Sequence, residues 1–125
     1  MKRKNMFCML ILFCLLSGFI VSAHGAESAS ENKKPAALID GTLNVKVGKT
    51  VYLDGTFSSD PGGANLDYSW TLLSSPNSSL AIISSSSDPQ ASFEADVAGT
   101  YRVKLIVNNG LTDSDPAYAE IIVTE

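Results

Sequence analysis

Apolar and polar residues alternate along short runs from Pro35 to the end of the chain. The clearest run spans residues 66–72, where every second residue is apolar and the residues between are polar. This period of two is typical of a strand with one buried face. No segment has a convincing helical period. The pattern predicts seven or eight strands, from the runs at residues 36–40, 43–47, 50–54, 66–72, 80–84, 91–95, 101–107 and 117–124.

Gly, Pro, Asn, Asp and Ser separate these runs at intervals of about 8–12 residues, which is the spacing of an all-β sandwich. A long turn covers residues 58–65, and Asn108-Asn109-Gly110 follows the run at 101–107. Asn-Gly favours a tight hairpin because both residues tolerate positive φ, so the last two strands are expected to pair. These features predict an all-β fold, an immunoglobulin-like antiparallel β-sandwich of about seven strands.

The first 25 residues have the layout of a secretory signal peptide. A basic start, from Lys2 to Lys4, precedes an apolar run over residues 6–21, and small residues follow. Cleavage is expected after Ala23 or after Gly25. The alternative is an uncleaved membrane anchor, but the run is shorter than the ~20 residues that a spanning helix usually needs.

The predicted organisation is a signal peptide at residues 1–25, a flexible polar leader at 26–34 and a β-sandwich domain at 35–125. This organisation predicts a secreted or periplasmic protein. It would contact a membrane only through the signal segment, and only if that segment is not cleaved.

Removal of the predicted signal peptide changes the chemistry available to the chain. Cys8, Cys14 and His24 are the only residues of their types, so cleavage after Gly25 leaves no thiol and no imidazole. The usual nucleophile–base triads are then unavailable, and the chain is not expected to be an enzyme. Three of the nine basic residues are also lost, which leaves six basic against 13 acidic residues and a net charge of −7. Such an acidic chain lacks the basic footprint of nucleic-acid binding.

Several sequence blocks occur in a characteristic order and spacing. They read VGKTVYLDG, FSSDP, LDYSW, DVAGTY, LIVNNG and IIV, at residues 47–55, 57–61, 66–70, 96–101, 105–110 and 121–123. In this order the blocks resemble the PKD domain family (polycystic kidney disease repeats) and cover most of the chain after the leader. The resemblance implies an immunoglobulin-like β-sandwich, an extracellular location and a role in contact with proteins or carbohydrates.

Four residues are expected in the core of such a sandwich. Trp70 lies in the middle of an apolar face, where the Trp of an immunoglobulin-like domain fills the core. Leu53 and Val103 occupy the positions that carry the disulfide in antibody domains, so the core is expected to be packed rather than cross-linked. Tyr101 lies just after Gly99 at the start of a strand. A tyrosine corner and a simple core aromatic both fit this position.

Asp60, Asp113 and Asp115 are the candidate metal ligands, and no other cofactor is predicted. Carboxylates on loops suit calcium, and the resemblance adds that some PKD-like domains are thought to bind it. The family often has Asp-Pro-Asp-Gly where this chain has DPGG at residues 60–63, so one carboxylate of that motif is missing. Local capping of the turn backbone is the alternative role of these residues.

Alternation also identifies apolar residues that face away from the core. Ile106, Tyr118 and Ile122 are expected to point outwards from the last two strands and to form a candidate binding surface. Tyr52 is expected to point outwards as well, in a position to stack on a sugar. The predicted function is a secreted, non-catalytic PKD-like module that mediates protein–protein interaction or adhesion, or serves as a spacer. The alternative is a carbohydrate-binding accessory protein, so the expected partner is an unknown protein or polysaccharide.

Overall fold

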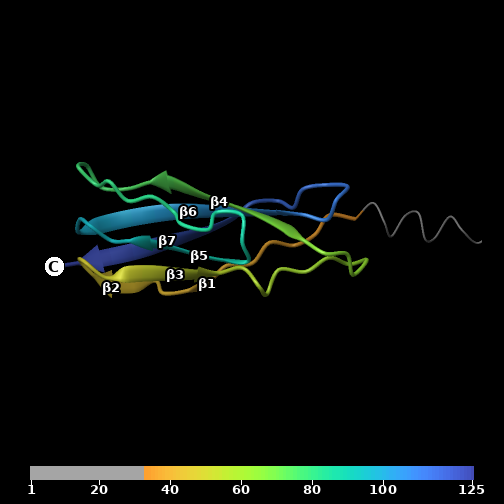
Figure 1. The fold of residues 1–125 in the computed structure, drawn as a ribbon, viewed down its shortest axis with the longest axis horizontal. Helices are drawn as coiled ribbons and strands as arrows, with labels where there is room; N and C mark the ends of the chain where they lie inside the picture. The colour runs from red at the N-terminus through yellow and green to blue at the C-terminus, as the bar shows by residue number, and fades with distance from the viewer. Residues whose placement is uncertain (1–32) are drawn as a thin grey trace, which may run out of the picture. The chain divides into compact units, whose positions relative to one another are not determined.

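Seven strands form two sheets in the computed structural model, which describes residues 33–125 (Figure 1). The strands are β1 (Asp40–Gly41), β2 (Asn44–Lys46), β3 (Thr50–Asp54), β4 (Asp67–Ser74), β5 (Gln90–Glu94), β6 (Gly99–Asn108) and β7 (Ala117–Thr124). The smaller sheet has the order β1-β3-β5, and the larger sheet has the order β2-β7-β6-β4. All neighbouring strands are antiparallel except β2 and β7, which run parallel.

The predicted all-β, immunoglobulin-like fold is confirmed for the part of the chain that the structure describes. No helix occurs within residues 33–125, so the described part of the chain has no helix that could cross a membrane. Residues 33–125 form a compact unit of their own. The predicted signal peptide at residues 1–25, and nearly all of the predicted leader at 26–34, lie outside the described residues.

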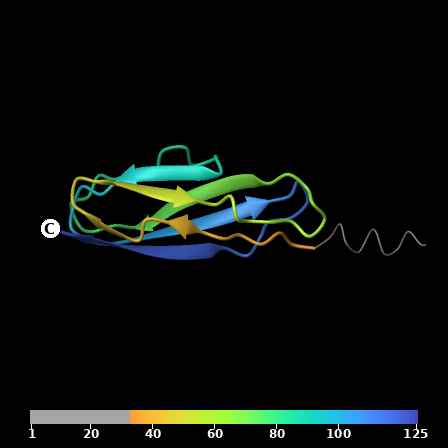
Figure 2. The same ribbon diagram turned by 90° about the horizontal axis from the view of Figure 1, so that it is seen from below.

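The core lies between the two sheets, which Figure 2 shows from a second direction. It arises from alternation: along β6, every second residue from Tyr101 to Val107 is fully buried, while the residues between them are exposed or half-buried. Full burial of a large apolar side chain contributes roughly 1.5–3 kcal/mol. Twelve buried apolar residues from both sheets make up one cluster: Val51, Leu53, Trp70, Ala91, Phe93, Ala95, Tyr101, Val103, Leu105, Val107, Ile121 and Val123.

Trp70 and Tyr101 satisfy their polar atoms inside this core. The Trp70 indole Nε1 donates a hydrogen bond to the backbone oxygen of Asp88 at 2.9 Å. The Tyr101 hydroxyl donates to the backbone oxygen of Val97 at 2.8 Å and accepts from the Val97 N–H at 3.1 Å. Tyr101 is therefore both a core aromatic and a tyrosine corner, so the two interpretations of this residue hold together.

The first predicted strand is shorter than the apolar pattern indicates. Of residues 36–40 only Asp40 belongs to β1. The Leu38 N–H donates instead to the Ser58 hydroxyl oxygen at 2.9 Å, and that hydroxyl donates back to the Leu38 carbonyl at 3.3 Å. A side chain thus takes the place of a neighbouring strand, and the ladder cannot continue there.

The run at residues 80–84 is not a strand. A single backbone bridge joins Ser84 to Ser92 of β5. At the start of the run, the Leu80 N–H donates to a carboxylate oxygen of Asp96 at 2.6 Å rather than to a backbone carbonyl. This side-chain contact holds the segment beside β5 without forming a ladder.

The last two strands pair as predicted, through a connection that is longer than a tight Asn-Gly turn. Residues 109–116 connect β6 to β7. The connection is stabilised by buried Ser114, whose N–H donates to the Val107 carbonyl at 2.7 Å and whose hydroxyl oxygen accepts from the Val107 N–H at 3.0 Å. The Asn-Gly dipeptide lies within this longer loop, with Gly110 at a φ of 92°.

Candidate functional site

The outward side chains of the larger sheet form an exposed surface, here called the large-sheet face. The structure places all three residues of the predicted binding surface on it. Tyr118 is 53% exposed and Ile122 is 41% exposed, and Ile106 is half-buried. The charged, aromatic and large apolar members of the face include Lys46, Asp67, Arg102, Lys104, Ile106, Tyr118, Glu120 and Ile122.

Charged residues separate the apolar members of the large-sheet face. In the register of β6 and β7, Lys104 lies opposite Tyr118, and Arg102 lies opposite Glu120. Tyr118 and Ile122 are therefore divided by an acidic residue along β7, and Lys104 stands between them and Ile106 on β6. The face is a mixed surface of apolar and charged groups rather than a continuous apolar patch.

Arg102 contacts two neighbouring side chains of this face, Tyr118 and Glu120. Its guanidinium carbon lies 5.5 Å from the centroid of the Tyr118 ring, within the range of a cation–π interaction. Its Nε lies 3.5 Å from a carboxylate oxygen of Glu120. Sequence reasoning missed Arg102, Lys104 and Glu120. Alternation alone would have placed all three outwards, but their contacts depend on a strand register that the sequence does not specify.

The outward side chains of the smaller sheet form a second surface, here called the small-sheet face. Its members are Asp40, Thr50, Tyr52, Asp54, Gln90, Ser92 and Glu94. Three of them are carboxylates. None of the strands β1, β3 and β5 carries Lys or Arg.

Tyr52 stands at the centre of the small-sheet face beside a cavity of about 270 Å³. Tyr52 is 65% exposed, as expected from the alternation. Asp40 and Asp54 lie opposite each other in the strand register, and the Gln90 amide donates to Asp54 at 3.0 Å. The Thr56 hydroxyl and backbone N–H, followed by the Gln90 amide, lower the pKa of Asp54 below its ordinary value, so this carboxylate stays ionised. An aromatic ring is thus combined with hydrogen-bonding groups in one hollow.

The three candidate calcium ligands each have a different partner. Asp60 accepts hydrogen bonds from the Gly62 and Ala64 N–H groups at 2.8 and 3.0 Å and from the Asn109 amide at 2.7 Å. The Ala64 N–H and the Asn109 amide lower the pKa of Asp60. These contacts are those of an Asp that stabilises a turn.

Asp113 and Asp115 are engaged elsewhere. Asp113 accepts from the Asn108 amide at 2.7 Å, and Asp115 forms an ion pair with Lys34 at 2.5 Å. Among residues 33–125, no three His, Cys, Asp or Glu side chains are grouped so that they could hold a metal ion. Calcium binding by Asp60, Asp113 and Asp115 stays a prediction.

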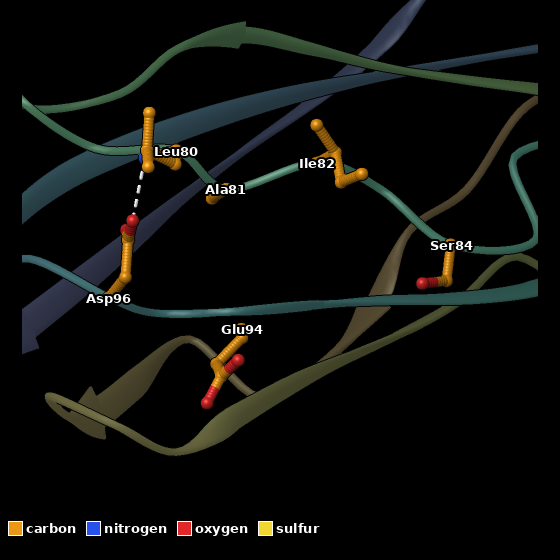
Figure 3. Close-up of a pocket in the computed structure, with 6 residues that line it drawn as sticks. All are labelled: Leu80, Ala81, Ile82, Ser84, Glu94 and Asp96. Carbon is orange, nitrogen blue, oxygen red and sulfur yellow. Dashed lines mark hydrogen bonds between the residues drawn. The ribbon is translucent and has the colours of Figure 1, made fainter.

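A second cavity, of about 300 Å³, lies between the segment 80–84 and β5 (Figure 3). Leu80 and Ile82 border it and are 86% and 78% exposed, whereas Ala81 and Ile83 pack against the core. Sequence reasoning placed a strand here and missed the cavity. The alternation of the four residues was readable, but the absence of a partnering strand was not.

The two carboxylates at this second cavity point in different directions. The Asp96 side chain points towards the Leu80 N–H, whereas the Glu94 carboxylate points away from the segment (Figure 3). The Ser79 hydroxyl and then the Leu80 N–H lower the pKa of Asp96. The arrangement suits a structural anchor and lacks the paired geometry of an acid and a base.

The protein is an immunoglobulin-like β-sandwich, and each of its two sheets has one outward face that carries exposed aromatic and charged side chains. The family model described as K319L-like, PKD domain, matches residues 41–123. The chain belongs to this family, and the resemblance to PKD domains is confirmed. No curated protein sequence matches the chain significantly.

Solved structures with similar folds include PKD domains and larger proteins. A nucleoside hydrolase-related hypothetical protein from Saccharophagus degradans, described as associated with carbohydrate metabolism, is 29% identical with a TM-score of 0.60. The match covers 74% of this chain and 26% of that chain, so this chain spans about a quarter of its length. The PKD domain of human KIAA0319 is 18% identical, with a TM-score of 0.61 and coverage of 74% and 82%. A protein from a structural study of carbohydrate-binding modules of the β-sandwich superfamily is 24% identical, with a TM-score of 0.56. That match covers 75% of this chain and 36% of the other chain.

Proposed function

We propose that the chain is an exported, non-catalytic interaction or adhesion module that binds a protein partner through its large-sheet face. The observation that carries this proposal is the exposed Tyr118, whose ring lies under the Arg102 guanidinium, with exposed Ile122 beyond Glu120 on the same strand. Aromatic residues and Arg are enriched where proteins bind one another. A Tyr that is already ordered loses little conformational freedom on binding.

The proposed non-catalytic role rests on the side chains that the described residues offer. Residues 33–125 contain no Cys and no His, and the carboxylates of Glu94 and Asp96 point in different directions. The exposed side chains are therefore suited to contact rather than to proton transfer or nucleophilic attack.

The test is capture of a protein from a cell-surface extract of the source organism by immobilised residues 33–125. We expect a discrete protein to be retained, and retention to fall at least tenfold in Tyr118→Ala and in Ile122→Arg. Tyr52→Ala is the matched control, because it removes an exposed Tyr from the opposite face. Equal retention by all three variants would contradict the role of the large-sheet face.

Carbohydrate binding is the second candidate, and the cavity beside Tyr52 favours it. A Tyr ring bordered by Asp40, Asp54 and Gln90 offers both a stacking surface and hydrogen-bonding groups for sugar hydroxyls. The Saccharophagus degradans protein is itself described as associated with carbohydrate metabolism. Retention on cellulose, chitin or xylan that is lost in Tyr52→Ala, and kept in Tyr118→Ala, would favour this function over the first.

Export is part of the proposal and rests on the layout of residues 1–25. N-terminal sequencing of the protein recovered outside the cytoplasm is expected to begin at His24 or at Ala26. Recovery of the intact N-terminus from a membrane fraction would instead favour an uncleaved anchor.

A further inference from the structure

The two outer faces of the sandwich carry opposite charge. All three Lys or Arg residues that lie within strands are on the large-sheet face, namely Lys46, Arg102 and Lys104. The same face carries two strand carboxylates, Asp67 and Glu120. Three positive and two negative groups leave this face slightly basic. The small-sheet face carries three strand carboxylates and no strand cation, so it is acidic.

The acidic groups of the small-sheet face have no cationic partner within the described chain. The two ion pairs among residues 33–125 are Lys34–Asp115 and Arg102–Glu120, and neither involves Asp40, Asp54 or Glu94. Asp40 lies directly opposite Asp54, and like charges in that position destabilise a sheet. A cation supplied from outside would relieve this repulsion.

Lys104 is the cation best placed to supply such a contact. It lies in the middle of β6, opposite Tyr118, and is in neither ion pair of the described residues. Arg102 is partly neutralised by Glu120, and Lys46 donates to the backbone oxygen of Glu125 at 2.5 Å. The large-sheet face thus presents a free ammonium group beside an exposed Tyr.

We propose that the large-sheet face of one copy of this chain binds the small-sheet face of a second copy. Lys104 would face the carboxylates around Tyr52, while Tyr118 and Ile122 would pack beside the Tyr52 ring. The two contacting surfaces differ, so the contact is heterologous and can repeat from copy to copy as an open chain. This inference rests on the proposed function because it uses the same large-sheet face and names a second copy as a partner of that face.

The area of the smaller sheet limits how strongly two copies are expected to bind. Three strands of at most five residues span about 14 Å by about 17 Å, which is roughly 240 Å² at the spacings of β-sheets. This is well below the ~800 Å² that each partner buries in a standard interface. The contact is therefore weak and transient. It depends on charge, because residues 33–125 carry six basic and 11 acidic groups, a net charge of −5, and copies that meet in other orientations repel.

The test uses residues 33–125, which form a compact unit with their own core. Sedimentation is measured over a range of protein concentrations at low ionic strength and at about 1 M salt, where the Debye length falls to ~3 Å. We expect the average mass to rise with concentration at low ionic strength and to return to the monomer in high salt. A constant monomer mass at low ionic strength would overturn the inference.

Two variants identify the surfaces. Lys104→Glu changes the large-sheet face, and the double variant Tyr52→Ser with Glu94→Gln changes the small-sheet face. Each alone is expected to remain monomeric. An equimolar mixture is expected to form one-to-one dimers and nothing larger, because each pair retains a single intact combination of faces. Self-association that persists in both separate variants would overturn the inference, and far-UV circular dichroism confirms that each variant is folded.

Failure of this inference and failure of the proposed function give different results. If copies stay monomeric while Tyr118→Ala still lowers capture of a protein from the extract, self-association is wrong and the proposed function stands. If copies associate through the two faces while capture from the extract is unaffected by Tyr118→Ala, the large-sheet face binds the chain itself, and the proposed foreign partner is wrong.

Discussion

Trp70 carries two roles at the scale of a single residue: its ring fills the core, and its indole N–H binds the Asp88 carbonyl. Trp70→Ala is expected to lower the free energy of unfolding by about 3–5 kcal/mol, because it leaves a large cavity. Trp70→Phe keeps most of the apolar contact but leaves the Asp88 carbonyl without this donor, so its cost is expected to be smaller. Denaturant unfolding followed by circular dichroism measures both. A loss below about 1 kcal/mol for Trp70→Ala would contradict its place in the core.

The Asp96 carboxylate joins the loop before β5 to the core residue Tyr101. One oxygen lies 2.6 Å from the Ser79 hydroxyl and 2.9 Å from the Tyr101 hydroxyl, and the other accepts the Leu80 N–H at 2.6 Å. The Ser79 hydroxyl, then the Leu80 N–H, hold the pKa of Asp96 below its ordinary value of 3.8. The unfolded chain then binds the proton more readily than the folded domain does.

The free energy of unfolding is therefore expected to fall as the pH drops below 3.8 towards the lowered pKa of Asp96. Asp96→Asn is expected to be less stable than the native domain near neutral pH and to lose less stability on acidification, because the titrating group is gone. Urea unfolding at about pH 6 and about pH 3 measures the difference. Asp67→Asn is the control, since Asp67 accepts no hydrogen bond through its side chain within residues 33–125. An unchanged pH dependence in Asp96→Asn would show that the titration of this carboxylate does not contribute to the loss of stability in acid.

Residue-level prediction succeeded where one pattern decides the outcome. Trp70, Leu53 and Val103 are buried because alternation fixes which side of a strand each side chain takes. Asp96 was not identified, because its partners Ser79 and Leu80 lie 17 and 16 residues earlier in a serine-rich loop. No local pattern brings these groups together; the path of the loop does.

The shortest element, β1, depends on a glycine. Gly41 has a φ of +136°, and a Cβ placed there would lie 2.2 Å from the backbone oxygen of Tyr52. Gly41→Ala is therefore expected to disrupt the pairing of β1 with β3 and to destabilise the domain by more than the ~1–2 kcal/mol of a left-handed residue alone. Thermal unfolding measures the loss.

Gly63→Ala is the matched control for that change. Gly63 also has a positive φ, of +77°, but a Cβ there would meet nothing within 4 Å. The difference between the two variants isolates the clash with β3 from the strain of the dihedral angle. Equal losses in both would mean that β1 is not held against Tyr52 as described. Because β1 carries Asp40, loss of its pairing is also expected to open the hollow beside Tyr52.

Alternation in the sequence predicts which runs are able to form strands, but it does not say whether a partner strand lies beside each run. The alternating run at residues 101–107 lies within β6, and the run at 66–72 lies within β4 except for Leu66, which precedes it. The run at 80–84 has the same alternation, yet it is not a strand, because the Asp96 carboxylate accepts the Leu80 N–H where a backbone ladder would continue. Register is the other limit: Tyr118 was expected to face outwards, but its position opposite Lys104 follows from the length of the 109–116 connection.

At the scale of the whole domain, one core joins both sheets. Leu53 and Phe93 come from the smaller sheet, whereas Trp70, Leu105 and Ile121 come from the larger, and all belong to one buried cluster. Neither sheet can therefore keep its apolar face covered if the other leaves. We expect residues 33–125 to unfold in one cooperative step, as small single domains usually do.

The single Trp makes this cooperativity measurable. Fluorescence of Trp70 reports on the larger sheet, and circular dichroism reports on all strands. The two urea transitions are expected to coincide, and to stay coincident in Leu53→Ala while their shared midpoint falls by the equivalent of about 2–5 kcal/mol. Because Cys8 and Cys14 are the only cysteines, reducing agent is expected to leave both curves for residues 33–125 unchanged. A circular dichroism transition that preceded the fluorescence transition in Leu53→Ala would mean that the smaller sheet unfolds by itself. The small-sheet face could then be lost while the large-sheet face remained, and the two binding surfaces would have separate stabilities.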